Sequence, residues 1–225
     1  MSTVNFKQDV YAQLARVARA IGHANRLELL EFVAQGPRSV DELANMTRMS
    51  VANTSKHLQE LRRAGLVQAR KEGVRVFYEV AGPDVVNLLG ALSSVAESRI
   101  AEVSQLLRTY ITARDDLEPV PAVELLARIR QGLVTVLDVR PPEEYATGHL
   151  PGAINIASDA LSSHLRRLPK GREVIAYCRG PYCLLSVDAV ALLRLKGYKA
   201  RRLEDGFPEW KASGLPVESL TTRMD

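Results

Sequence analysis

The sequence predicts two domains: a mostly helical domain that ends in a β-hairpin, followed by an α/β domain in which helices cover both faces of a parallel sheet. Helical periodicity dominates the first half, two strand-like runs flank Gly73, and strands alternate with helices after residue 134. A polar, acidic stretch bounded by proline separates the two patterns. We therefore expect domains at 1–113 and 121–225, joined by a linker at 114–120.

In the first domain, apolar residues at helical spacing predict two helices, and Gly36-Pro37 stops the second. Ser39 and Glu42 form a capping box for a short third helix, and Ser50 caps a fourth. The expected elements are helices at 6–22, 25–34, 40–46, 51–63 and 83–113, and strands at 66–69 and 74–80.

In the second domain, short apolar runs alternate with helical patterns, as in parallel sheets buried on both faces. The expected elements are strands at 134–139, 153–156, 174–177 and 200–203, and helices at 141–146, 161–168, 184–196 and 207–212. Sheets of this kind place their sites outside the carboxyl ends of the strands. Cys178 follows such an end directly.

Composition indicates the class of protein and its cellular compartment. The chain has 225 residues, of which 46% are hydrophobic and 25% charged, as in globular domains. No apolar run approaches the roughly 20 residues of a membrane span, and residues 1–7 lack the apolar core of a secretory signal. We expect a cytoplasmic protein without membrane contact. In a reducing compartment, its two cysteines indicate catalytic or redox chemistry rather than a structural disulfide.

A short turn, Thr47-Arg48-Met49, joins the third and fourth helices, and the hairpin follows them. This order predicts a winged helix-turn-helix, whose second helix enters the major groove of DNA. Small and polar side chains there can approach base edges and phosphates, and basic side chains on the wing can meet the DNA backbone or the minor groove. The predicted DNA contacts are Ser50, Ala52, Asn53, Thr54, Ser55, Lys56, His57, Arg70, Lys71 and Arg75.

The distribution of charge agrees with this interpretation. Residues 38–75 carry eight basic and four acidic side chains, and this excess equals the net charge of the whole chain, +4. A nucleic-acid-binding face explains the excess. From charge alone, a solvated basic face explains it equally well.

Three segments, 22–30, 50–58 and 61–67, resemble the ArsR family of bacterial repressors, and the resemblance spans roughly residues 5–110. It implies a homodimer, paired through the first and last helices, on a near-palindromic operator with half-sites about 34 Å apart. Metal-binding relatives use cysteines near the third helix, or Asp and His on the last helix. This third helix has no cysteine and this last helix no histidine, so we expect no metal site.

The two cysteines, Cys178 and Cys183, lie between a predicted strand and a predicted helix. A thiol at a strand end that faces a helix N-terminus lies near unpaired N–H groups and the positive end of the helix dipole. Both favour the thiolate, which is the reactive form of cysteine. The candidate catalytic residues are Cys178, Arg179 and Cys183, and the rest of the loop is Gly180, Pro181, Tyr182 and Leu184.

The second half resembles the rhodanese family over roughly residues 119–218. The matching segments are 137–145, 148–155, 177–179, 197–198 and 203–210, in the order of the family. The resemblance implies a rhodanese-like fold in which Cys178 takes a sulfane sulfur and holds it as a persulfide. It also implies that N–H groups of residues 179–184 cradle the anion. No cofactor is expected.

The loop departs from the family pattern. Family members usually carry Ser or Thr six residues after the cysteine; the best match is Ser186, so this loop is about two residues longer. A longer loop should widen the pocket, and this puts thiosulfate in doubt as the substrate. Cys183 replaces the usual basic or hydroxylic residue of the mid-loop. It either attacks a Cys178 persulfide, leaving a disulfide or polysulfide bridge, or packs under the loop.

Other residues near the site have structural interpretations. Asp138 and Arg140 are expected to pair and fix the loop after their strand. His149 is expected to be a turn and packing residue, and Trp210 to anchor the last helix. Arg179 either guides an anionic substrate or faces solvent.

Three functions fit these observations. The first is a DNA-binding repressor whose second domain senses or transfers reactive sulfur, with small sulfur species as ligands. The second is a sulfurtransferase enzyme that carries a DNA-binding domain. The third is an arsenic- or oxyanion-responsive repressor. In the first function, modification of the thiol loop changes the affinity for DNA. In the second function, the affinity for DNA does not depend on sulfur.

Overall fold

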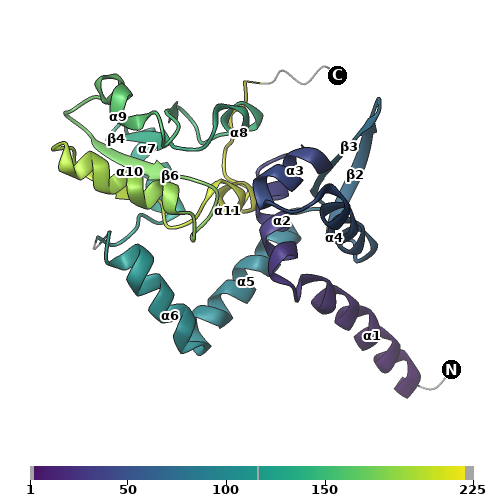
Figure 1. The fold of residues 1–225 in the computed structure, drawn as a ribbon. Helices are drawn as coiled ribbons and strands as arrows, with labels where there is room; N and C mark the ends of the chain where they lie inside the picture. Colours follow the sequence, from purple (N-terminus) through teal and green to yellow (C-terminus); the bar gives the residue numbers. More distant parts are fainter. Residues whose placement is uncertain (1–2, 116, 221–225) are drawn as a thin grey trace. The chain divides into compact units, whose positions relative to one another are not determined.

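The computed structural model describes residues 3–115 and 117–220 (Figure 1). Residues 1–2 of the predicted first domain, residue 116 of the predicted linker and residues 221–225 of the predicted second domain lie outside this description. Two compact units form, Met1–Val85 and Val86–Asp225. The domain boundaries expected from the sequence stay a prediction. Within the described ranges, no helix combines the length and apolar character needed to cross a bilayer.

The first unit is a helical domain with a small antiparallel sheet, as predicted. Its elements are α1 (Thr3–Ile21), α2 (Ala24–Ala34), β1 (Arg38–Ser39), α3 (Val40–Thr47), α4 (Val51–Arg63), β2 (Val67–Glu72) and β3 (Arg75–Val80). The sheet has the order β1-β3-β2. Strand β1 was not predicted, because two residues carry no periodicity. The capping box at Ser39 and Glu42 is confirmed.

Local sequence explains the helix-turn-helix. Arg48, in the turn between α3 and α4, adopts a left-handed conformation with φ 56°, which ends α3 sharply. Ser50 then caps α4 by accepting a hydrogen bond from the Asn53 N–H at 3.3 Å. Leu58 and Leu61 on α4 are fully buried and fix the rotation of the helix against the core.

The helix predicted over 83–113 is three segments: α5 (Pro83–Arg99), α6 (Ala101–Leu107) and η1 (Arg108–Thr112), a π-helical turn. The break lies at Ile100, whose backbone is extended with φ −111° and ψ 107°. The Ser104 hydroxyl donates to the Glu97 carbonyl at 2.9 Å and so satisfies an acceptor that the interrupted helix leaves unpaired. Apolar periodicity continues through the break, so the sequence did not reveal it.

The second unit continues with an α/β fold. Its remaining elements are α7 (Ala122–Arg130), β4 (Val134–Asp138), α8 (Pro142–Thr147), β5 (Ile154–Asn155), α9 (Leu161–His164), η2 (Leu165–Arg167), β6 (Glu173–Tyr177), α10 (Leu184–Leu195), β7 (Ala200–Arg202) and α11 (Phe207–Ala212). All four strands are parallel, in the order β5-β4-β6-β7. Helix α7 was not predicted; every other element lies within a few residues of its predicted place.

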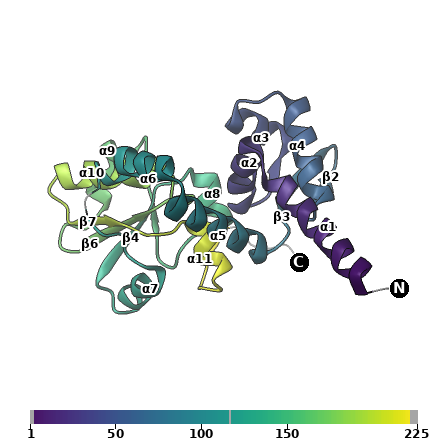
Figure 2. The same cartoon turned by 90° about the horizontal axis from the view of Figure 1, so that it is seen from below.

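Helices cover both faces of the parallel sheet, as Figure 2 shows. Side chains of α9 and α10 pack on one face, and those of α7 and α11 on the other. Strand β6 contributes alternately to both cores: Val174, Ala176 and then Cys178 belong to the first, Ile175 and Tyr177 to the second. Period-two alternation therefore sets the face on which Cys178 lies.

The acidic stretch before the sheet is anchored to the second unit. The buried Asp115 carboxylate lies 2.8 Å from the Arg194 guanidinium of α10 and 3.2 Å from that of Arg202. The Val120 N–H donates to the Arg202 carbonyl at 2.9 Å, which extends the edge of the sheet beside β7. The stretch is thus tied to α10 and β7 at both ends.

A charged cluster is buried at the carboxyl ends of β4 and β6. The Arg140 guanidinium lies 2.7 Å from the Asp138 carboxylate, and both side chains are completely buried. The Tyr177 hydroxyl donates to the same carboxylate at 2.5 Å. Arg140 also donates to the Gly148 carbonyl at 2.7 Å and lies over the Phe207 ring at 4.3 Å. The predicted Asp138–Arg140 pair is confirmed, and it joins two strands, a loop and α11.

Replacing Arg140 with methionine should destabilise the second unit by about 3 to 5 kcal/mol, because the Asp138 carboxylate stays buried without its partner. The double variant Asp138→Asn, Arg140→Met removes both charges and should recover part of the loss. Trp210, the only tryptophan of the chain and fully buried in this unit, reports its unfolding in urea by fluorescence. A loss below about 1 kcal/mol, typical of an exposed pair, would contradict the expectation.

Candidate functional site

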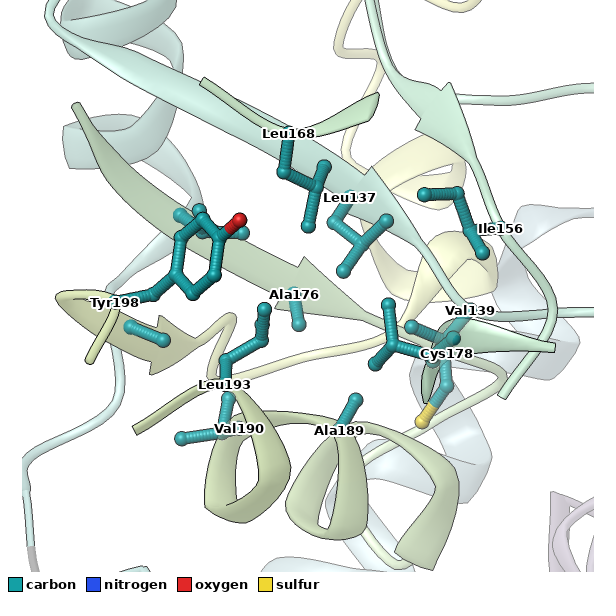
Figure 3. Close-up of a cluster of buried hydrophobic side chains, with 13 residues drawn as sticks. Leu137, Val139, Ile156, Leu168, Ala176, Cys178, Ala189, Val190, Leu193 and Tyr198 are labelled. Atoms are coloured by element: carbon teal, nitrogen blue, oxygen red, sulfur yellow. The ribbon is translucent and has the colours of Figure 1, made fainter. Parts of the chain in front are cut away.

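Cys178 lies at the end of β6, on the face that α10 covers. Figure 3 shows its side chain beside Val139 and across from Ala189, within the first hydrophobic cluster. Only 1% of the residue is exposed. The position predicted at the carboxyl end of a central strand is confirmed, and the sulfur is enclosed rather than open to solvent.

The loop after Cys178 is tightly held at both sides. The Cys183 N–H donates to the Gly180 carbonyl at 3.1 Å, which closes a turn, and the Phe207 N–H donates to the Cys178 carbonyl at 3.1 Å. A Cβ atom on Gly206 would come within 2.5 Å of the Arg179 carbonyl oxygen, so only glycine fits there. The segment before α11 therefore presses directly on the cysteine loop.

The Cys178 thiol is surrounded by acceptors. It donates to the Ser186 hydroxyl at 3.2 Å and to the Cys183 carbonyl at 3.3 Å. Burial, aided by the hydrogen bond to Cys183, raises the pKa of Cys178 well above its ordinary value. The sequence favoured a thiolate at this position; in this conformation the thiol form is favoured, because burial outweighs the N–H groups of the helix start.

Cys183 packs against the same hydrophobic cluster but is less enclosed than Cys178. It is the N-cap residue of α10 and is only half-buried. The hydrogen bond from Cys178 is the largest cause that lowers the pKa of Cys183 to about 7; burial opposes it, and the N–H groups of Arg179 and Leu185 assist it. The two cysteines are therefore joined through the Cys178 thiol, which also donates to the Cys183 carbonyl at 3.3 Å.

Arg179 does not point a free charge into the loop. Its guanidinium forms a forked ion pair with the completely buried Glu144 carboxylate of α8, at 2.8 to 3.1 Å. Arg179 therefore does not simply face solvent: its side chain is paired and 18% exposed. A role in guiding an anionic substrate stays a prediction. Glu144 was missed by the sequence analysis, since nothing local marks a glutamate in a first helical turn as buried.

The other loop residues frame the two thiols. Gly180 is buried, Pro181 and Leu184 are half-buried, and Tyr182 is exposed. The Tyr182 hydroxyl donates to the Glu97 carboxylate of α5 at 2.6 Å, a contact within the unit Val86–Asp225. The loop thereby touches the last helices of the predicted first domain. The sequence gave no signal for this partner.

Two structural interpretations near the site are confirmed. His149 is buried, its Nδ1 lies 2.8 Å from the Tyr145 carbonyl, and its ring stacks on that of Tyr145 with centroids 3.8 Å apart. Trp210 is fully buried and donates from Nε1 to the Pro216 carbonyl at 2.8 Å, which ties α11 to the segment that follows. Neither residue borders the sulfurs as an acid or base.

Helix α4 presents most of the predicted DNA contacts at its surface. Ala52, Asn53 and Lys56 are exposed, and Ser55 and His57 are half-buried. Thr54 is a correction: its side chain is completely buried and its hydroxyl donates to the Ser50 carbonyl at 3.1 Å. Thr54 lies four and seven residues before Leu58 and Leu61, so it belongs to the core face and cannot reach DNA.

The wing carries the remaining predicted contacts. Arg70, Lys71 and Arg75 are exposed on β2 and β3, which pair in register up to Glu72 and Arg75. Arg70 pairs with Glu72 at 2.5 Å, an exposed contact that is easily exchanged for a phosphate.

The two histidines of the first unit interact with each other. The His57 ring packs against that of His23, with centroids 4.6 Å apart, and burial followed by the His23 charge lowers the pKa of His57. His23 in turn caps α2 by accepting from the Asn25 N–H at 3.2 Å. In residues 3–115 and 117–220, no three His, Cys, Asp or Glu side chains gather as metal ligands.

Comparison with known proteins assigns both halves. Residues 121–213 match the rhodanese-like domain, and residues 23–69 match the ArsR family of bacterial regulatory proteins. The chain is 42% identical over 206 residues to the HTH-type transcriptional regulator Rv0324 of Mycobacterium tuberculosis, which covers 92% of this chain and 90% of that protein.

Two further relatives each match one half. A sulfurtransferase of Allochromatium vinosum is 33% identical over 85 residues, covering 37% of this chain and 78% of that protein. The homodimeric winged helix-turn-helix DNA-binding domain of a Mycobacterium bovis protein is 39% identical, with a TM-score of 0.40, covering 42% of this chain and 87% of that one. This chain belongs to the ArsR-family helix-turn-helix transcriptional regulators that carry a rhodanese-like domain.

Proposed function

We propose that this regulator is a homodimeric, cytoplasmic repressor whose DNA affinity is controlled by reactive sulfur at the loop Cys178–Cys183. One observation carries the proposal: two cysteines are hydrogen-bonded to each other in one loop, and Tyr182 of this loop is hydrogen-bonded to Glu97 of α5. The loop thus combines a site for sulfur chemistry with a connection to the helices that follow the wing.

The chemistry requires only a sulfane-sulfur donor such as hydrogen polysulfide. A cysteine thiolate attacks one sulfur of the donor, the sulfur–sulfur bond breaks, and the shortened polysulfide leaves with the electron pair. The cysteine then carries a persulfide, with Cys178 as the persulfide position expected from the rhodanese pattern. If the second cysteine attacks the persulfidated sulfur, hydrosulfide leaves and a disulfide closes within the loop.

Three contacts support transmission from the loop to α5, α6 and η1. Tyr182 reaches Glu97 directly. Helix α10, which begins at the loop, holds the segment after η1 through Asp188 with Arg114 and Arg194 with Asp115, both at 2.8 Å. Sulfur can bias DNA binding only if it favours one state of the dimer. A bridge that displaces Tyr182 or α10 would change these contacts and hence the pairing helices.

The DNA-reading surface consists of the exposed residues of α4 and of the wing. Asn53 and Lys56 on α4 are free of the core and suit base edges and phosphates. A homodimer would present two such surfaces to a near-palindromic operator. Arg70, Lys71 and Arg75 would add contacts to the DNA backbone or minor groove.

A sulfurtransferase enzyme with an attached DNA-binding domain is the second candidate. The similarity of the second half to the Allochromatium vinosum sulfurtransferase favours it. This function requires repeated turnover from a sulfane donor to cyanide or a thiol, with DNA affinity independent of sulfur. The enclosed position of Cys178 argues against rapid exchange of large donors.

The sulfur response can be measured by gel shift on a duplex that the wild-type protein selects from a random-sequence pool. Polysulfide should change the affinity of the wild type by about 5- to 150-fold, the usual range of allosteric coupling. Cys178→Ser and Cys183→Ser should bind the duplex normally without responding. Equal affinity with and without polysulfide would remove the regulatory function, and release by arsenite instead would favour an oxyanion-responsive repressor.

Replacing Tyr182 with phenylalanine tests the connection to α5. The variant keeps both thiols but loses the hydroxyl that reaches Glu97, so sulfur should still modify the loop. The polysulfide-dependent change in DNA affinity should shrink by about two- to tenfold, the value of one hydrogen bond. Tyr198→Phe is the matched control, since that hydroxyl donates to the Leu165 carbonyl of η2 at 2.9 Å and not to a residue of α5. Equal responses in both variants would contradict the role of Tyr182.

Replacing Lys56 with alanine tests the DNA surface. If Lys56 meets a phosphate in each half-site, affinity should fall for all duplexes alike, and the salt dependence should lose about two counterions per dimer. Lys196→Ala removes the same charge from an exposed position in the second unit and should change neither quantity. Fluorescence anisotropy at several salt concentrations measures both the affinity and its salt dependence. An unchanged salt dependence for Lys56→Ala would contradict a contact between Lys56 and a phosphate.

A further inference from the structure

We infer that the first unit contains a separate ligand site, a cavity lined by arginines that binds a compact oxyanion with two or more negative charges. The cavity has a volume of about 500 Å³ and lies where the C-terminal ends of α1 and α4 meet the start of α2. This site is independent of the cysteine loop and of the sulfur chemistry proposed for it. The residues that line the cavity are Arg16, Arg19, Ala20, Arg26, Glu60, Arg63 and Ala64.

The charge of the cavity wall favours an anion. Among the described residues that line it, four are arginines and one, Glu60, is acidic. Glu60 lies 2.6 Å from Arg63, and these side chains are 45% and 68% exposed, so water weakens the pair. Guanidinium groups stay protonated in proteins. Four like charges around one cavity repel each other, and a bound anion with several charges removes this repulsion.

Two of the arginines are held in place by backbone carbonyls. Arg26 donates to the Ala20 carbonyl at 2.5 Å and to the Arg19 carbonyl at 2.8 Å, and Arg16 donates to the Arg63 carbonyl. These carbonyls lie at the C-terminal ends of α1 and α4, where the helix itself provides no partner. They carry only partial negative charge, so they fix each guanidinium without neutralising it. A guanidinium has five N–H donors, so both side chains retain donors for a ligand.

Helix capping alone does not explain the cavity. It accounts for Arg16 and Arg26, because each satisfies carbonyls at the end of a helix. Arg19 and Arg63 are exposed, and neither side chain donates to a helix end in the part of the chain that the structure describes. Such side chains are free to extend into solvent, yet both line the cavity beside the two fixed arginines. The four groups therefore converge on one volume.

Size and lining define the class of ligand. A volume of about 500 Å³ lies within the range of small-molecule sites. The described lining has no aromatic ring on which a nucleotide base could stack, and its apolar side chains are those of Ala20 and Ala64. Guanidinium groups bind the oxygens of phosphate, sulfate and carboxylate groups in forked pairs. These properties fit a compact polyanion such as an oligophosphate.

The cavity lies apart from the predicted DNA contacts of α4. Those contacts end at His57, whereas Glu60 and Arg63 belong to the last turn of the helix. Because a helix rises 1.5 Å per residue, Arg63 lies about 10 Å along the axis from Lys56. A small anion is therefore favoured over a DNA phosphate as the occupant. A ligand held here would connect α1, the expected pairing helix, with α4.

Isothermal titration calorimetry of the full-length protein with inorganic pyrophosphate tests the site. At about 0.15 M NaCl, where exposed charges are screened, the wild type should bind with a dissociation constant below about 1 mM. Arg19→Gln removes one lining charge without touching a helix end and should weaken binding about 5- to 20-fold. Arg62→Gln is the matched control, because it removes the same charge from an exposed neighbour outside the lining and should leave the affinity nearly unchanged.

Glu60→Gln separates ligand binding from a purely structural role of the arginines. Removal of this carboxylate frees Arg63 and removes a charge that repels the anion, so pyrophosphate should bind about two- to tenfold more tightly. Arginines that only cap helices predict no change in this variant. Circular dichroism confirms that each variant is folded.

The site is rejected if the wild type shows no saturable binding of pyrophosphate, or if Arg19→Gln and Arg62→Gln bind it equally well. It is also rejected if pyrophosphate does not bind while Arg19→Gln, and not Arg62→Gln, lowers the affinity for DNA. In that case the arginines around the cavity contact DNA instead of a small anion.

Discussion

The buried Asp138–Arg140 pair is the constraint on which the second unit depends. Two opposite charges without solvent contact must satisfy each other, and here they also engage the Tyr177 hydroxyl and the Gly148 carbonyl. Tyr177 directly precedes Cys178 and lies on the opposite face of β6. The hydrogen bond that holds Tyr177 therefore also restrains the backbone of the next residue, Cys178. A charged cluster on one face of the sheet thus positions the sulfur site on the other face.

A second buried pair restrains the loop itself. Arg179 and Glu144 hold the residue after Cys178 to α8, and Gly206 allows the segment before α11 to approach the loop backbone. Between these supports, the chain is free to place Cys183 at the start of α10.

In the first unit, buried side chains also fix the position of an exposed surface, here that of helix α4. The rotation of α4 is fixed by three buried side chains, Thr54, Leu58 and Leu61. Because this face is buried by packing, Asn53 and Lys56 are exposed on the opposite side of the helix. The exposed polar surface of α4 is thus a consequence of the apolar stripe behind it.

The sequence by itself determined both domain types, nearly all helices and strands, the Asp138–Arg140 pair, and Cys178 at a strand end, because periodicity, caps and adjacent charges act over a few residues. The tertiary structure decided what depends on distant partners: the break at Ile100, the burial of Thr54, and the Glu144 and Glu97 contacts of the loop. It also decided how far each cysteine is buried. In the sequence, both cysteines lie close to the start of the same helix. Only packing buries Cys178 and leaves Cys183 half-buried.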